Sequence, residues 1–364
     1  MPALITHSLF AEETLLYLPH ELFSNGEEQR AYILGSQGPD PFFCRWTGPV
    51  AHNHTCHVLA NQMHAEKVAA ALESLRAAVL ALPKEDQGIG RAFTVGLFAH
   101  YWLDSHAHPF VYAEQEALGA QDPDLVSAHS EVHAVIEADI DSWLLWVRKE
   151  EGAETGEAAQ RALETTPQIS RIGSALFSQT AHEVYGLPLD GKQYGHAVRD
   201  YARLYHALEP KGRLSEITLT NVEELAREYS MLASLVHPAH HDTPCASANT
   251  EHHVWKDPAT GKESTESFLD VFEEVEKSWP EAAEAFLAGK DLFPLTGNRN
   301  YNGDFMSEGE GAPDIVLGYE ALPVKRVSPS DPGIYREFPG SDGLYMPTLP
   351  PGCAKRVFDA RSSV

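Results

Sequence analysis

The chain has 364 residues, of which 43% are hydrophobic and 9% aromatic, enough apolar sequence for the core of a globular protein with one or two domains. Its formal net charge of −26 argues against binding to a nucleic-acid backbone, which needs clustered Lys and Arg, and against docking on anionic membranes. The four cysteines are irregularly spaced and form no C-x-x-C pair, which argues against a disulfide scaffold.

The first residues, Met-Pro-Ala-Leu-Ile-Thr-His, lack the basic and apolar regions of a signal peptide. No uninterrupted apolar run approaches the ~18 residues of a transmembrane helix. We therefore expect a cytoplasmic protein without a transmembrane segment. The sequence does not indicate an oligomeric state.

Helical periodicity dominates the chain, so the expected fold is an all-α multi-helix bundle. In chain order, the predicted helices cover residues 10–18, 27–34, 57–82, 90–108, 124–148, 169–184, 194–207, 222–235 and 264–287, and residues 151–164 are expected to be a surface helix or a linker. Residues 35–56 and 237–258 are expected loops. Pro109 disfavours helix at the residue before it, so the fourth helix is expected to end near His108. Pro280 is expected to break or kink the last helix.

The chain divides into two expected parts. Residues 1–292 are predicted to form the helical domain. Residues 293–364 are rich in Gly, Pro and Tyr, and are predicted to be an irregular extension that packs on the main domain. That extension is expected to hold short strands around 315–319 or to run as extended chain.

Two predicted helices carry a metal-binding type of residue at every fourth position. These sets are His100, Asp104 and His108 on the first helix, and His129, His133 and Glu137 on the second. A four-residue step turns only about 40° around a helix axis, so each set shares one face. Imidazoles and carboxylates on two opposed faces make a zinc-type ligand set. Burying such groups in a bundle is costly without a metal.

Helix geometry also selects among the neighbouring residues. His106 lies about 240° around the axis from His100, so His108 is the better candidate ligand. Asp141 continues the face of the second set and is a candidate to orient a ligand histidine. His129 extends that face and is a candidate ligand, supporting residue or substrate contact, with an exposed helix position as the alternative.

Three further residues stand in less distinctive settings. Asp40 lies in a Gly-Pro-Asp-Pro turn, where flanking prolines stiffen the backbone around a carboxylate. Spacing alone does not separate a ligand from an ordinary turn aspartate. His64 lies on a predicted apolar helix and His7 lies near Phe10, and neither belongs to a spacing pattern by itself.

In these segments the chain resembles the zinc-dependent phospholipase C family, which includes bacterial phospholipases C, single-strand-specific fungal nucleases and the catalytic part of glycosylphosphatidylinositol-specific phospholipase D. The residues that carry the resemblance are Thr6-His7-x-x-Phe10-Ala11, the run LGSQGPDPFF that contains Asp40, the run GLFAHYWLD that ends at Asp104, His108-Pro109-Phe110-Val111, and His133-x-x-x-Glu137-x-x-x-Asp141. The segment around Asn249, Trp255, Pro258 and Ser267-Phe268 is also similar to bacterial members. The resemblance covers residues 1–290 and leaves the tail uncovered.

The resemblance implies an all-α fold around a cluster of two to three zinc ions. By matching position, Asp40, His64, His100 and Asp104 would hold the first zinc; His108, His133 and Glu137 the second; and His7 with a bridging Asp104 the third. In secreted relatives the mature N-terminal residue completes the third site, whereas here Pro2 lies closer to His7 than in those relatives. Asp40 is the implied catalytic residue, as a general base or water-orienting group.

The expected function is that of a zinc-dependent phosphate-ester hydrolase, phospholipase C-like, in which metal-activated water attacks phosphorus. The substrate class is a small phosphate ester or a phospholipid headgroup. One alternative is a nuclease-like phosphodiesterase, which predicts base-stacking aromatics such as Trp46, Trp102 or Trp255 near the metals. The other is a noncatalytic zinc-binding or scaffold protein, which predicts closed coordination.

Overall fold

The computed structural model describes residues 3–149, 155–208 and 245–306, and these segments are mainly helical. The α-helices are α1 (Leu4–Thr14), α2 (Gly26–Gly35), α3 (Val50–Ala65), α4 (Val68–Ala81), α5 (Gln87–Gln121), α6 (His129–Lys149), α7 (Thr155–Ala162), α8 (Pro167–Tyr185), α9 (Gln193–Leu208), α12 (Phe268–Leu287) and α13 (Leu292–Thr296). The prediction of an all-α fold is confirmed for this part of the chain. The expected helix at 222–235 and the expected strands at 315–319 lie outside it.

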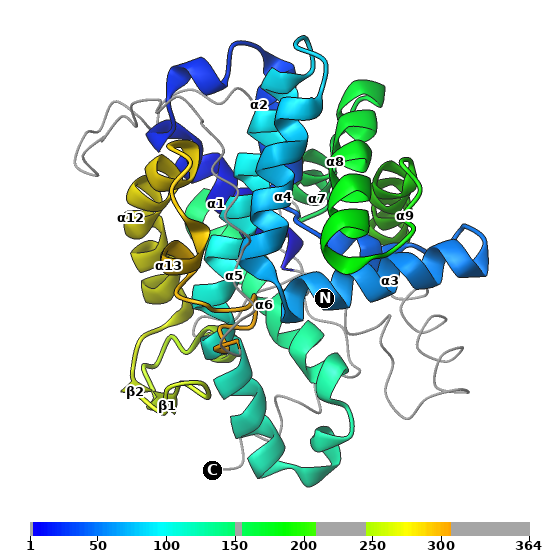
Figure 1. The fold of residues 1–364 in the computed structure, drawn as a ribbon. Coiled ribbons are helices and arrows are strands. Elements are labelled where there is room, and N and C mark those ends of the chain that lie inside the picture. Colours follow the sequence, from blue (N-terminus) through cyan, green and yellow to red (C-terminus); the bar gives the residue numbers. More distant parts are fainter. Residues whose placement is uncertain (1–2, 150–154, 209–244, 307–364) are drawn as a thin grey trace.

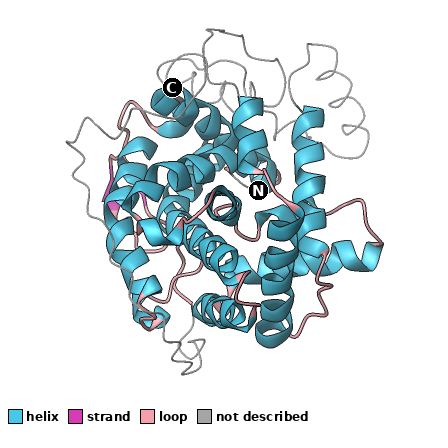
Figure 2. Cartoon of the chain, turned by 90° about the horizontal axis from the view of Figure 1, so that it is seen from above, coloured by secondary structure: helices cyan, strands magenta, loops and turns pink. Residues whose placement is uncertain are grey.

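Short elements connect these helices. The 3-10 turns are η1 (Leu15–Tyr17), η2 (His20–Leu22), η3 (Asp40–Cys44), η4 (Pro123–Val126) and η5 (Ala246–Ala248). Strands β1 (Trp255–Lys256) and β2 (Glu263–Ser264) form an antiparallel hairpin in which Trp255 pairs with Ser264. This hairpin lies at the edge of the bundle (Figure 2).

Helix α5 organises the bundle. It contacts α1, α2, α4, α6, α8 and α12, with α12 and α13 on one side and α8 and α9 on the other (Figure 1). The contact with α2 is close, because Gly35 and Gly96 bring the two backbones together. An added Cβ would lie 2.2 Å from the Phe93 carbonyl oxygen at Gly35, and 2.1 Å from the Tyr32 carbonyl oxygen at Gly96. This packing holds the turn after α2 against the middle of α5.

The predicted end of a helix at His108 is wrong, because α5 runs through Pro109 to Gln121. An internal proline costs about 3 kcal/mol. Beyond it, Phe110, Val111 and Leu118 are buried, and each such side chain contributes about 1.5–3 kcal/mol. Burial therefore outweighs the lost hydrogen bond. A break at Pro280 is likewise wrong, since α12 continues through it with its apolar face buried.

The predicted helix 57–82 is two helices, and the first begins at Val50, inside the expected loop. The chain turns between them at Lys67, which has a left-handed φ of 55°. Other boundaries also shift: α1 begins at Leu4, α6 at His129 and α12 at Phe268. Ser267 caps α12 in a capping box with Asp270.

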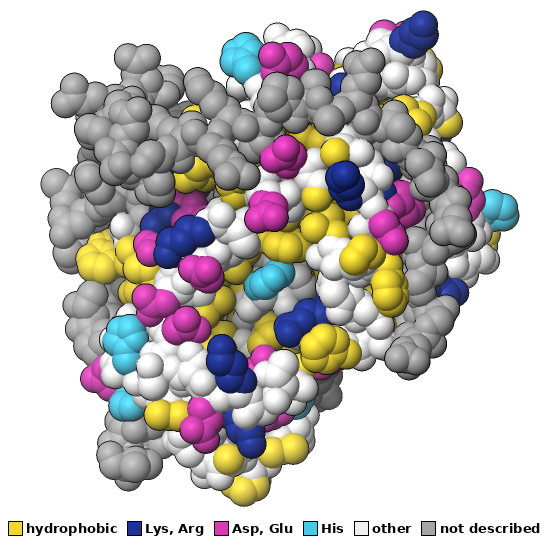
Figure 3. Space-filling model, turned by 60° about the vertical axis from the view of Figure 1, so that its left-hand side comes forward, with side chains coloured by type: hydrophobic (Ala, Val, Ile, Leu, Met, Phe, Trp, Pro, Cys, Tyr) yellow, Lys and Arg dark blue, Asp and Glu magenta, His cyan; other side chains and the backbone are white. Residues whose placement is uncertain are grey.

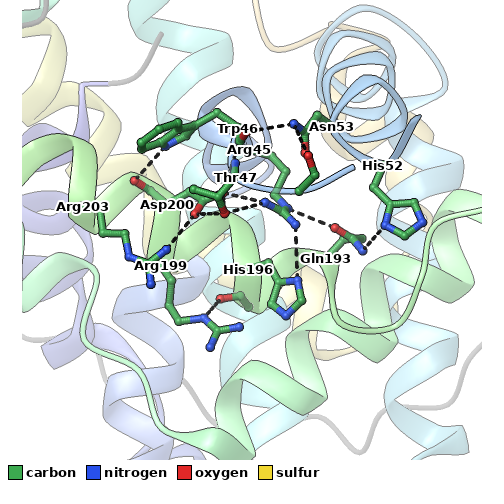
Figure 4. Close-up of polar contacts among 12 residues, drawn as sticks. Arg45, Trp46, Thr47, His52, Asn53, Gln193, His196, Arg199, Asp200 and Arg203 are labelled. Atoms are coloured by element: carbon green, nitrogen blue, oxygen red, sulfur yellow. Dashed lines mark hydrogen bonds and ion pairs between the residues drawn. The ribbon is translucent and has the colours of Figure 1, made fainter. Parts of the chain in front are cut away.

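A buried ion pair links α9 to the residues that follow η3 (Figure 4). Arg45 donates to Asp200 at 2.6 Å and to the Gln193 side-chain oxygen at 3.1 Å. Asp200 also accepts from the backbone N–H groups of Trp46 and Thr47. The Thr47 hydroxyl donates to the other carboxylate oxygen, Oδ1, at 2.7 Å, so both oxygens have donors and the network fixes the end of the turn that begins at Asp40.

Acidic side chains are spread over the face shown in Figure 3, in keeping with the strongly negative net charge. No helix among residues 3–149, 155–208 and 245–306 is long and apolar enough to cross a bilayer.

Candidate metal centre

The inward face of α5 carries the first predicted set of ligands. His100 Nε2 lies 3.2 Å from Asp104 Oδ2, and His108 Nδ1 lies 3.9 Å from Asp104 Oδ1. Helix α1 adds His7, whose Nε2 lies 2.9 Å from Asp104 Oδ1. Asp104 is therefore surrounded by imidazoles from two helices. His106 is exposed on the opposite face, with Nδ1 2.7 Å from the Trp102 carbonyl oxygen, as the helix geometry predicts.

Helix α6 faces the next turn of α5. His133 Nε2 lies 3.2 Å from Glu137 Oε1, and His108 Nε2 lies 3.5 Å from the same oxygen. These three residues come from two helices and are all buried. They form one compact group of two imidazoles and one carboxylate.

The turn η3 and the end of α3 bring in two more residues. Asp40 Oδ1 lies 3.1 Å from His64 Nε2, and Asp40 Oδ2 lies 3.8 Å from His100 Nε2. Gly38 makes this approach possible: it has a φ of +52°, and an added Cβ would lie 2.2 Å from His100 Cδ2. The turn thus places its carboxylate against α5.

All eight predicted ligands meet in three groups, each able to hold a metal ion. The groups are His7, His100 and Asp104; Asp40, His64 and His100; and His108, His133 and Glu137. Within each group the ligand atoms lie within 4.8 Å of one another. The third group is the set implied for the second zinc. The other two share His100, so Asp40, His64 and Asp104 surround one imidazole.

Four of the histidines have their Nδ1 atoms occupied by oxygen acceptors. Nδ1 donates to the Ala60 carbonyl in His64, the Ser36 carbonyl in His100, the Tyr301 carbonyl in His108 and the Gln115 side-chain oxygen in His133. The distances run from 2.7 to 3.1 Å. A carbonyl can only accept, so the Nδ1 atoms of His64, His100 and His108 carry the proton. Nε2 is then left to bind a metal, which is the usual support of a metal-ligating histidine.

The carboxylates of the centre are held in the charged form. Burial raises the pKa of Asp104, but His100, His108 and His7 outweigh it and hold that pKa well below its usual range. The same opposition between burial and neighbouring histidines lowers the pKa of Asp40 and of Glu137. Burial lowers the pKa of His108, but Asp104 and Glu137 raise it to about 9.

Two buried nitrogens test whether a metal fits here. His100 Nε2 and His7 Nδ1 have no hydrogen-bond partner among the described residues, although both side chains are buried. Leaving a buried polar atom without a partner costs free energy. A cation at His100 Nε2, which lies close to Asp40 and Asp104, would satisfy that atom. The donor set of imidazole and carboxylate suits zinc.

Three other predicted residues lie outside these groups. His129 is exposed at the first residue of α6. Trp255 packs on Phe110 with ring centroids 5.4 Å apart, and its Nε1 donates to the Glu266 carbonyl. Asp141 accepts from the backbone N–H groups of Ile5 and Thr6 at 3.0 and 2.7 Å, and so anchors the start of the helix that carries His7.

Sequence reasoning missed the residues that support the histidines. Gln115 follows His108 by seven residues, two turns along the same face of α5. Following the helix face of the predicted ligands beyond His108 would therefore have identified Gln115. Ser36 and Tyr301 act through backbone carbonyls, which leave no signal in residue type. Comparisons with family models, curated proteins and solved structures found no significant match. The resemblance to the phospholipase C family therefore rests on the motif residues themselves.

Proposed function

We propose that this protein is a zinc-dependent hydrolase of a phosphate ester, phospholipase C-like in its chemistry. The observation that carries the proposal is that three metal-capable groups adjoin one another. Two of them share His100, and the third adjoins them where His108 Nδ1 lies 3.9 Å from Asp104 Oδ1. Such clustered cations would more than offset the three carboxylates, leaving positive charge for a phosphate group in an otherwise acidic protein. Bound zinc would polarise a phosphoryl oxygen and supply hydroxide near neutral pH.

Asp40 is the proposed base. Its carboxylate is ionised at neutral pH, because His100 and His64 overcome the effect of burial on its pKa. It lies in a turn between α2 and α3, at hydrogen-bond distance from His64, so its orientation is fixed. A carboxylate held in this way can accept a proton from a water beside it, or orient that water toward phosphorus.

The substrate class is a phosphodiester or phosphomonoester. The net charge of −26 disfavours bulk anionic lipid as the immediate surface, so soluble esters belong in the assay beside phospholipids. The experiment is a hydrolysis screen of both classes, with and without a chelator and with zinc restored. We expect turnover that the chelator abolishes and zinc restores.

A matched pair of variants on α5 makes the test specific. His108 belongs to a ligand group, whereas His106 is exposed two residues away. We expect His108→Ala to lose zinc and turnover, and His106→Ala to retain both. Equal loss from the two variants, or chelator-resistant turnover, would contradict the proposal. Zinc binding without any turnover would favour a noncatalytic zinc protein, and turnover confined to single-stranded nucleic acid would favour the nuclease alternative.

A further inference from the structure

The segment 298–306 lies directly against the metal centre, although it follows the part of the chain that resembles the phospholipase C family. It forms a closed turn. Met306 N–H donates to the Asn298 carbonyl, and Asn298 Nδ2 donates to the Met306 carbonyl at 2.8 Å. Inside the turn, Asn300 Oδ1 accepts from the N–H groups of Asn302 and Asp304. These bonds give the segment a defined shape of its own.

The turn caps the helix that carries His64. Tyr301 N–H donates to the His64 carbonyl at 3.1 Å, and Asn300 Nδ2 donates to the Ala65 carbonyl at 3.4 Å. The last carbonyls of a helix have no partner within the helix. Their pairing here satisfies the last carbonyls of α3, and it fixes the backbone of a candidate ligand.

Tyr301 also reaches the group formed by His108, His133 and Glu137. The Tyr301 carbonyl accepts from His108 Nδ1 at 2.8 Å. Its N–H and its carbonyl thus bind the backbone of one candidate ligand and the ring of another. Between them, the Tyr301 ring packs against the rings of His64 and His100, with centroids 4.9 and 5.6 Å away. Tyr301 is 1% exposed, so these contacts exclude water.

A further contact extends this support toward His133. Asn302 Oδ1 accepts from the Tyr112 hydroxyl at 3.2 Å. The Tyr112 ring lies 5.7 Å from His108 and 5.1 Å from His133, measured between centroids. The turn therefore touches three candidate ligands directly, His64, His100 and His108, and a fourth, His133, through one tyrosine.

We infer that Tyr301 is a positioning residue of the metal centre, which fixes the Nδ1–H form of His108 and the placement of His64 and His100 in one step. This inference rests on the proposed zinc centre and deepens it. It assigns to the C-terminal segment a role in metal affinity that the motif residues do not include. Supporting residues of this kind change metal affinity by about 10- to 100-fold.

The first test uses the wild-type protein loaded with zinc alone. Long-range ¹⁵N–¹H correlation spectra of the histidine rings distinguish the two ring nitrogens. We expect His108 to carry its proton on Nδ1 and to bind zinc through Nε2. Zinc bound through Nδ1 of His108 would overturn the inference.

The second test measures zinc affinity by competition with a chromophoric chelator. Tyr301→Ala removes the ring and is expected to weaken zinc binding by about 10- to 100-fold. Tyr301→Phe keeps the ring and backbone and should bind zinc as the wild type does. Phe286→Ala is the control for a lost buried ring, since Phe286 stacks on Phe98 in the core, with centroids 4.4 Å apart. It should lower stability without weakening zinc binding.

The outcomes separate this inference from the proposed function. If the wild type binds zinc and Tyr301→Ala binds it equally well, the inference fails while the zinc centre stands. If the wild type binds no zinc, the proposed function fails and the inference fails with it. Should Tyr301→Ala not fold, the ring-nitrogen assignment in the wild type still decides the matter.

Discussion

At the scale of single residues, Gly38 determines how closely the η3 turn approaches His100. Its φ of +52° suits glycine, and a Cβ would lie 2.2 Å from the His100 ring. We predict that Gly38→Ala displaces that imidazole, weakens zinc binding about tenfold or more, and lowers the unfolding free energy by about 1–3 kcal/mol.

Chelator competition and urea denaturation measure these two effects. Gly191→Ala is the matched control, because a Cβ at Gly191 would meet nothing within 4 Å. Wild-type zinc affinity in Gly38→Ala would contradict the role given to His100.

The grouping of the candidate ligands could be predicted at this scale, but the residues that support them could not. Four-residue spacing selects His108 over His106, because both lie on one regular helix. The acceptors of the ring protons are mostly backbone carbonyls, as at Ser36 and Tyr301. Any residue type can supply a carbonyl, so only the folded path of the chain identifies these partners.

At the scale of elements, Asp141 anchors the start of α1. It accepts from the first N–H groups of that helix, at Ile5 and Thr6, and removing it would leave buried donors without partners. We predict that Asp141→Ala lowers the unfolding free energy of the metal-free protein by about 1–3 kcal/mol. It should also weaken zinc binding, because His7 lies on the same helix.

Ser267→Ala provides the comparison for an ordinary helix cap on α12, remote from the ligand residues in sequence. It should cost about 1 kcal/mol and leave zinc affinity unchanged. Equal zinc affinities for the two variants would show that α1 needs no anchor to hold His7.

Element boundaries were the weakest part of the sequence prediction. The rule that proline disfavours helix at the residue before it predicts a helix end near Pro109. However, α5 continues through Pro109, because side chains on both sides of it are buried. Apolar periodicity joined residues 57–82, yet the turn at Lys67 separates α3 from α4. The last carbonyl of α3 is capped by a residue 235 positions later. No local window contains such a contact.

At the scale of the whole molecule, the Arg45–Asp200 pair joins the η3 region to α9 (Figure 4). Burial raises the pKa of Asp200, but hydrogen bonds from Thr47, Trp46 and Arg45 outweigh it and lower the pKa below 3.8. A lowered pKa means that this contribution to stability is present above 3.8 and is lost as the pH falls through the folded-state pKa.

We therefore predict that Asp200→Asn costs about 3 kcal/mol at neutral pH, and that its difference from the wild type narrows as the pH falls below about 4. Urea denaturation across this range measures both effects. Arg203→Gln is the control, because Arg203 is largely exposed beside the same carboxylate and should cost only about 0.5 kcal/mol. A difference in unfolding free energy between Asp200→Asn and the wild type that widens at acid pH would contradict this prediction.

The most direct test of the central claim is the zinc content of the purified protein. Native mass spectrometry of the metal-free chain, titrated with zinc, counts the ions that each chain binds. We predict two to three, because the two groups that share His100 compete for its one free nitrogen, and fewer in Asp104→Asn, because Asp104 joins His7 to His100. A folded wild-type chain that binds no zinc, or an Asp104→Asn variant that binds as many ions as the wild type, would contradict the account.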